Sequence, residues 1–359
     1  MHRADEIILH IGFAKTGTTA IQRFLLSQKS ALLAQGVLWP TSDDNHYHLR
    51  SIISDDPASQ IQIGRLGLSP DDTQQFLEKW RANFLTEIEK TKPQRIVLST
   101  EYLNGAKPHE FGRLRDFLKP LCNRLRVLAY IRDPWTMAVS TAQQNIRNGN
   151  WKAPVPLAMA LNFHTAIQRF RAGLDNDIEV HIYSNDVVND FLSWTGLNLQ
   201  YERAQRVNRG VGLYTACVIA EMNRLYPVFD ENGVYQHDRA RDWMVECVSR
   251  AFPEEPAIRM NRNTAELLYA KAEAELRAIE ADHFGGRRMF DINSAELCDE
   301  LDDSLHIGRL DSETATRGMM AAMRGLSERA LHYFDENRRL RELWKSRTDT
   351  PTPLLTPNS

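Results

Sequence analysis

Residues 12–19 have the residue types of an anion-binding loop. They read Gly-Phe-Ala-Lys-Thr-Gly-Thr-Thr and lie between the apolar run at residues 6–11 and a stretch with helical spacing. Backbone amides and the dipole at the start of a helix favour a phosphate at such a place. The two-glycine spacing is that of a nucleotide P-loop, but Thr18 stands where an NTPase has its lysine, which here is Lys15, inside the loop. This displacement of the lysine argues against ordinary ATP chemistry. The alternative to an anion-binding loop is a capped helix start in which the lysine is incidental.

The run Lys-Thr-Gly-Thr-Thr that begins at Lys15 resembles the 5′-phosphosulfate loop of the sulfotransferases that use 3′-phosphoadenosine 5′-phosphosulfate (PAPS). The resemblance implies that Lys15 meets the oxygen that bridges sulfate and phosphate. It also implies that the 5′-phosphate is held by Thr16, Gly17, Thr18 and Thr19.

Residues 130–134 read Tyr-Ile-Arg-Asp-Pro and resemble a second motif of that family. As in that motif, a serine, Ser140, follows Arg132 by eight positions. The resemblance implies that Arg132 and Ser140 hold the 3′-phosphate. Arginine suits this role because its planar fork makes paired, charge-assisted hydrogen bonds to phosphate oxygens. Taken alone, Arg132 also fits a strand-end arginine paired with a carboxylate, and Ser140 a solvated helix serine. Two motifs in the expected order are a stronger indication than either one.

Further along the chain, the resemblance implies a late basic loop that closes over the nucleotide, with Arg206 and Arg209 as phosphate contacts. The family's aromatic contact to adenine and its glycine-tryptophan form of this loop are not found in the sequence. The resemblance covers about residues 7–208.

Sulfuryl transfer needs a base for the proton of the acceptor hydroxyl. Glu101 directly follows an apolar strand candidate, and a carboxylate at this place resembles the glycan-directed branch of the family; a capping or loop carboxylate is the alternative. His48, ranked ahead of its neighbour His46, is the rival base because histidine titrates near neutral pH. His10 alternates within a buried strand and is expected to be a core residue.

These residues predict a PAPS-dependent sulfotransferase that uses no metal and acts on an acceptor hydroxyl. We expect a carbohydrate or glycolipid acceptor, and a phenol or lipid alcohol stays open. Two alternatives remain: a P-loop small-molecule kinase that uses ATP and magnesium, and a non-catalytic protein that binds a nucleotide or a partner with the same fold.

The elements that must position these residues alternate along the chain. Strands are expected at residues 6–11, 95–99, 126–131 and 178–183, with helices between them, among them 187–194 closed by Gly196. Asp133 suits a helix N-cap and Pro134 the first helical position. The pattern predicts an α/β fold with a P-loop-type, doubly wound, mainly parallel sheet flanked by helices. Ligands of such sheets bind beyond the carboxyl ends of the strands, where the candidate residues lie.

From about residue 213 the sequence consists of long charged stretches with helical periodicity, such as residues 261–280 and 314–345. We therefore expect a PAPS-binding core over residues 1–212 and a helical C-terminal extension over 213–346 that packs on this core. Residues 347–359, rich in Thr and Pro, are expected to form a disordered tail.

The composition is that of an ordinary globular protein, with 42% hydrophobic and 25% charged residues in 359. A formal net charge of -3 gives no global attraction to nucleic acid. The four cysteines lie far apart, and no stretch approaches the roughly 18 to 20 apolar residues of a membrane helix. These features predict a cytoplasmic protein without a transmembrane segment or a nucleic-acid partner.

Overall fold

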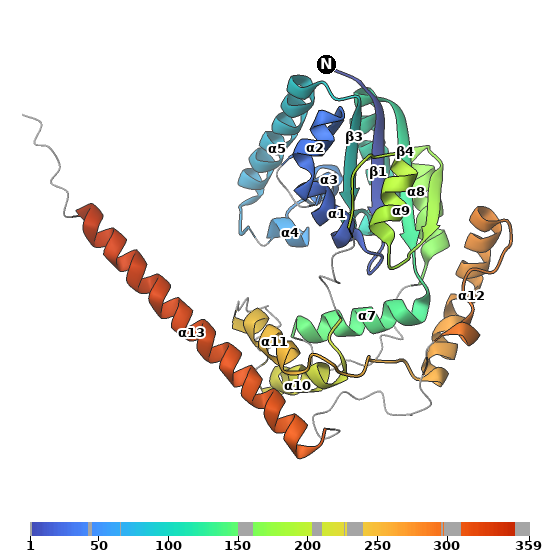
Figure 1. The fold of residues 1–359 in the computed structure, drawn as a ribbon. Helices are drawn as coiled ribbons and strands as arrows, with labels where there is room; N and C mark the ends of the chain where they lie inside the picture. The colour runs from blue at the N-terminus through green and yellow to red at the C-terminus, as the bar shows by residue number, and fades with distance from the viewer. Residues whose placement is uncertain are drawn as a thin grey trace, which may run out of the picture. The chain divides into compact units, whose positions relative to one another are not determined.

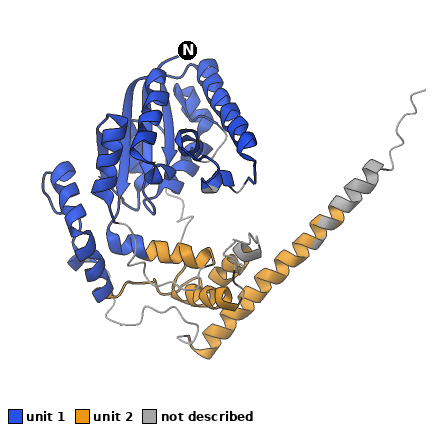
Figure 2. Ribbon diagram, turned by 180° about the vertical axis from the view of Figure 1, so that it is seen from behind, with its two compact units in different colours: residues 1–138, 157–208, 262–296 blue, residues 139–156, 209–261, 297–359 orange. Residues whose placement is uncertain are grey.

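The computed structural model describes residues 2–41, 45–64, 66–149, 161–202, 210–225, 227, 240–295, 297 and 310–348. The chain divides into two compact units (Figure 2). Unit 1 comprises residues 1–138, 157–208 and 262–296, and unit 2 comprises residues 139–156, 209–261 and 297–359. The units interleave along the chain, whereas the sequence predicted a single boundary near residue 212.

Unit 1 contains a sheet of five strands in the order β2-β3-β1-β4-β5, in which every neighbouring pair is parallel (Figure 1). The strands are β1 (Ala4–Gly12), β2 (Val37–Leu38), β3 (Arg95–Thr100), β4 (Cys122–Ile131) and β5 (Ile178–Ile182). The sequence predicted four of them. It missed β2, because a strand of two residues is too short to leave a hydrophobic period.

Helices precede and follow these strands. In unit 1 they are α1 (Thr18–Ser27), α2 (Lys29–Ala34), α3 (His48–Ile53), α4 (Ile61–Gly64), α5 (Pro70–Thr91), α6 (Pro108–Leu118), α8 (Phe163–Leu174), α9 (Val187–Thr195) and α12 (Arg262–Phe284), with 3₁₀ turns η1 (Tyr102–Gly105), η2 (Lys119–Leu121) and η3 (Ile292–Ser294). Helix α7 (Pro134–Arg147) begins in unit 1 and continues into unit 2. The predicted α/β class with a parallel sheet flanked by helices is therefore confirmed.

The core of unit 1 explains why the strands read as continuous apolar runs. Ile7, Ile8, Leu9 and Ile11 of β1 are all fully buried, so both faces of the sheet are covered, as is usual for parallel sheets. On one face Ile8 packs in a cluster with residues of α1, α2 and α9. The central strand β1 is thus packed on both of its faces.

The strand order brings the functional loops together. The chain leaves β1 toward β2 at one edge, returns to β3 beside β1, and then crosses to β4 on the other side of β1. The order of the strands therefore reverses around β1, and ligands of open parallel sheets bind beyond the carboxyl ends at such a point. The segments that follow β1, β3 and β4 carry residues 12–19, Glu101 and Arg132.

Several helix ends follow the predicted local chemistry. Helix α7 starts as expected, because Asp133 Oδ1 accepts a hydrogen bond of 2.7 Å from the Thr136 amide and Pro134 takes the first helical position. Gly196 ends α9 with a left-handed φ of 64°. The first predicted helix is divided into α1 and α2, and Gly36 follows α2 with a φ of 70°.

Unit 2 is described by α10 (Leu213–Leu225), α11 (Ala240–Ala251) and α13 (Ser312–Thr348), together with the later part of α7. Two glycines let α13 approach its neighbours closely. A Cβ at Gly318 would lie 2.4 Å from Val218 Cγ2, and one at Gly325 would lie 2.8 Å from Met244 Cα. The tail was predicted from residue 347, but α13 continues to Thr348, and the rest of the predicted tail lies outside the described residues. Among the described helices, none is long and apolar enough to cross a membrane.

Candidate functional site

The loop between β1 and α1 has the backbone shape of an anion cradle. Two of its residues take left-handed φ angles, 64° at Lys15 and 82° at Gly17, the residue that precedes α1. No side chain caps α1, and the first amides of any helix have no carbonyl of their own helix to bond. The amides at the start of α1 are therefore suited to an anion.

The glycines of the loop are required by close packing. A Cβ at Gly12 would lie 2.2 Å from Thr18 Oγ1, and a Cβ at Gly17 would lie 2.7 Å from Val187 Cγ1. Both separations are below what carbon side chains tolerate, so the loop admits only glycine at these two positions without rearrangement. The sequence motif is thus also a packing motif.

The threonines of the loop have different surroundings. Thr16 is fully buried and its hydroxyl donates a 2.7 Å hydrogen bond to the Phe13 carbonyl, so it stabilises the loop itself. Thr18 is also buried, and its Oγ1 has no hydrogen-bond partner among the described residues. A buried hydroxyl without a partner costs free energy, and such an atom fits a site that a polar ligand completes. Thr19 is exposed.

Arg132 joins this loop to the end of β4. Its Nη1 donates a 3.0 Å hydrogen bond to the Lys15 carbonyl oxygen, and its Nε donates one of 2.9 Å to Thr136 Oγ1. The guanidinium carbon lies 4.6 Å from the centre of the Tyr183 ring, which follows β5. The side chain is therefore fixed by three elements of unit 1.

The contacts of Arg132 correct the simplest form of its predicted role. Two of its nitrogens bind the protein, so the whole fork is not available to a phosphate. Nη2 makes no hydrogen bond to a described residue and remains the donor for a ligand. A left-handed conformation costs about 1–2 kcal/mol for a residue other than glycine, and the hydrogen bond from Arg132 helps to hold Lys15 in it. Arg132 therefore shapes the loop and also places a positive charge beside it.

Glu101 follows β3 and lies within the electrostatic reach of Lys15. Burial raises the pKa of the Glu101 carboxyl above its usual value, and the positive charge of Lys15 opposes that rise. Three predicted residues from three strand ends, Lys15, Arg132 and Glu101, are thus brought together in unit 1.

Three further residues were predicted to contact a phosphate, namely Ser140, Arg206 and Arg209. Ser140 is half-buried in the part of α7 that belongs to unit 2, so the structure does not place it beside the loop. Arg206 and Arg209 lie outside the described residues.

The histidines occupy the interior. His48 is 3% exposed and stacks between Tyr47, at 3.9 Å between ring centres, and Trp80, at 5.0 Å. His46 is fully buried and its Nδ1 accepts a 3.0 Å hydrogen bond from the Ser99 amide. His10 is a core residue as predicted, and burial lowers its pKa to about 3.

Three residues near the loop were not assigned a role from the sequence. Thr136 anchors Arg132, Tyr183 lies under its guanidinium, and Asn104 donates a hydrogen bond to the carbonyl oxygen of Gly12. Thr136 carries a weak signal, because it lies one helical turn after Arg132. No spacing rule identifies Tyr183 or Asn104, whose contacts depend on how the strands are ordered.

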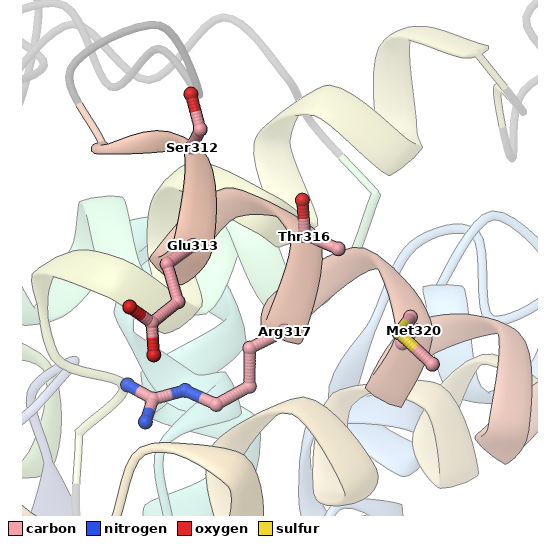
Figure 3. A pocket seen from close by; sticks show the side chains of 5 residues that line it. All are labelled: Ser312, Glu313, Thr316, Arg317 and Met320. Carbon is pink, nitrogen blue, oxygen red and sulfur yellow. The ribbon is translucent and has the colours of Figure 1, made fainter.

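Other regions offer less chemistry. A cavity of about 620 Å³ in unit 2 lies along the first turns of α13, where Figure 3 shows the lining side chains of Ser312, Glu313, Thr316, Arg317 and Met320. The guanidinium of Arg317 lies over the Phe252 ring at 4.8 Å, and the cavity has no buried titratable residue. In the described part of the chain, no group of three or more His, Cys, Asp or Glu residues is arranged to hold a metal ion.

Comparison of the chain with protein-family models, with curated proteins and with solved structures finds no significant match. The function is therefore inferred from the site itself. Its parts are an amide-lined loop with one ammonium group, a guanidinium with a remaining donor, and a carboxylate with a raised pKa. This set of groups is suited to binding a phosphorylated anion next to a proton acceptor.

The raised pKa of Glu101 predicts that the stability of the protein depends on pH. A carboxyl whose folded pKa lies above its unfolded value near 4.5 contributes stability at low pH and loses it as the pH rises through the folded value. Glu101→Gln cannot ionise, so it should be more stable relative to the wild type at about pH 8 than at about pH 4.5. Denaturant unfolding of both proteins at these pH values measures the difference.

Asp311→Asn is the matched control. Hydrogen bonds from Thr314 lower the pKa of Asp311, so that carboxylate is ionised in both states over this interval and its replacement should change stability equally at both pH values. A Glu101→Gln effect that is also independent of pH would contradict the raised pKa.

Proposed function

We propose that this chain is a PAPS-dependent sulfotransferase that transfers a sulfuryl group to an acceptor hydroxyl. The observation that carries the proposal is the contact between Arg132 and the Lys15 carbonyl, at 3.0 Å, next to a carboxylate that responds to the Lys15 charge. One residue of each phosphate motif, Lys15 and Arg132, thus lies at this loop. We also assign the sheet to the P-loop type on this basis.

In the proposed reaction the residues act mainly by position and charge. The acceptor oxygen forms a bond to sulfur while the bond between sulfur and the bridging oxygen breaks, and the electron pair leaves with adenosine 3′,5′-bisphosphate. Glu101 takes the proton of the acceptor hydroxyl. The Lys15 ammonium offsets the negative charge that develops on the departing oxygen.

The two phosphates of the nucleotide have separate donors in this scheme. The amides at residues 17–19 serve the 5′-phosphate, together with the Thr18 hydroxyl, which has no hydrogen-bond partner among the described residues. Nη2 of Arg132 serves the 3′-phosphate.

The choice of base favours Glu101 over His48. His48 is packed between two aromatic rings, and a proton acceptor must reach the substrate hydroxyl within about 3.2 Å or through one water. Glu101 is less buried and lies close enough to Lys15 to respond to its charge. A carbohydrate or glycolipid hydroxyl remains the proposed acceptor.

A kinase that uses ATP and magnesium is the second candidate, because the two-glycine loop is shared by both classes. The lysine position argues against it, since Lys15 lies inside the loop rather than after Gly17.

Ligand binding separates these proposals without any assay of turnover. Adenosine 3′,5′-bisphosphate at about one hundred times its dissociation constant should stabilise the wild type by about 2.7 kcal/mol without added metal. Arg132→Ala should abolish this stabilisation, measured by thermal shift. Arg124→Ala, a matched substitution of a largely exposed arginine in β4, the strand that Arg132 follows, should leave it unchanged.

Stabilisation by ATP with magnesium but not by the bisphosphate would favour the kinase. An Arg132→Ala protein that still responds fully to the bisphosphate would remove the 3′-phosphate assignment.

The base assignment predicts a pH profile. Activity should fall as the pH falls through the raised pKa of Glu101, because the base must be ionised. Glu101→Gln should lower kcat by about 10²–10⁴ and remove this acid limb. Transfer of labelled sulfate to a panel of glycans measures both effects, with His48→Asn as the comparison. Unchanged turnover in Glu101→Gln would exclude Glu101 as the base.

A further inference from the structure

Asn104 connects the ends of two neighbouring strands. Its Nδ2 donates a 2.8 Å hydrogen bond to the carbonyl oxygen of Gly12, the last residue of β1. The same nitrogen lies 3.3 Å from the carbonyl oxygen of Glu101, the residue that follows β3. One side-chain amide therefore bridges the start of the phosphate loop and the peptide of the proposed base.

This bridge begins where the backbone ladder ends. Strands β1 and β3 are paired up to Ile11 opposite Thr100, and no pairing extends to Gly12 and Glu101. Beyond this point the two segments separate, the one after β1 into the phosphate loop and the one after β3 into η1. The Asn104 amide supplies the link that the sheet no longer provides.

Asn104 is itself held from outside by Arg169 of α8. The Arg169 guanidinium donates a 2.9 Å hydrogen bond from Nη2 to the Asn104 backbone carbonyl. This contact fixes the last part of η1 and leaves the Asn104 side chain aimed at the strand ends. Rigid supporting contacts of this kind hold reacting groups within the narrow geometry that catalysis requires.

The polar side chain of Asn104 lowers the stability of the fold through one of its buried atoms. Its Oδ1 is buried and has no hydrogen-bond partner among the described residues, and neither has Nε of Arg169. An unpaired buried carbonyl destabilises the fold, and an apolar side chain of the same size would avoid this loss. The donor side of the amide is thus the part that the fold uses.

We propose that Asn104 is a positioning residue, which holds the Glu101 carboxylate beside Lys15 by tying the Glu101 peptide to Gly12. The inference rests on the proposed function of this site. Asn104 acts through Glu101 and the loop and needs no contact with the reacting atoms. Without its hydrogen bonds, the segment that carries Glu101 is free to move away from the loop and to admit water.

The test uses Asn104→Ala and Asn104→Leu; the second keeps most of the side-chain volume, so that folding is maintained without the donor. Asn176→Ala is the matched control. Asn176 also donates its Nδ2 to a strand carbonyl, that of Leu125 in β4, at 2.7 Å. It carries the same kind of bond at another place in unit 1.

The first readout is the titration of Glu101, followed by NMR in protein with ¹³C-labelled glutamate and assigned with Glu101→Gln. Burial is the main cause that raises the Glu101 pKa, so readmitted water should lower that pKa toward its usual value in both Asn104 variants. Asn176→Ala should leave it unchanged. A Glu101 pKa that stays at its wild-type value in both Asn104 variants would overturn the positioning role.

The second readout separates positioning from binding. Turnover with PAPS should fall by about 100-fold in kcat, while the dissociation constant of adenosine 3′,5′-bisphosphate changes by less than about twofold. Equal losses in the Asn104 variants and in Asn176→Ala would indicate general destabilisation and contradict the proposal. If the wild type transfers no sulfate, the proposed function fails, and the titration alone still decides the role of Asn104.

Discussion

The hydrogen bond from Arg132 to the Lys15 carbonyl is the interaction on which the site depends. It joins the end of β4 to the loop after β1 and accounts for a left-handed backbone at a residue that is not glycine. Because Thr136 and Tyr183 hold the same guanidinium, its hydrogen bond to the Lys15 backbone is supported by contacts within the protein. The loop is preorganised, and binding has less conformational entropy to overcome.

The sequence predicted the parts of this arrangement that depend on local pattern. Four strands were visible as apolar runs, because a parallel sheet covered on both faces needs uninterrupted Val, Ile and Leu. The glycine loop and the Asp133 cap were visible because their backbone shapes demand particular residue types. Even the meeting of Lys15, Arg132 and Glu101 followed from a general property of such sheets, that strand ends share one edge.

The remaining features could not be predicted, because they are contacts between segments far apart in the chain. Arg132 was expected to spend its donors on a phosphate, and two of its nitrogens instead bind Lys15 and Thr136. His48 was the rival candidate for the base, yet three aromatic rings from α5 and its own segment enclose it. The bridge made by Asn104 follows from strand order, which no local pattern encodes.

The central claim is that Lys15 and Arg132 act on one ligand through one shared loop, and a double-mutant cycle tests it most directly. Calorimetric titration with adenosine 3′,5′-bisphosphate, without metal, gives dissociation constants for the wild type, Lys15→Gln, Arg132→Gln and the double variant. Both single substitutions should weaken binding, with a coupling free energy of about 0.5–3 kcal/mol between them. Losses that add to within about 0.5 kcal/mol, or a wild type that does not bind the bisphosphate, would contradict the claim.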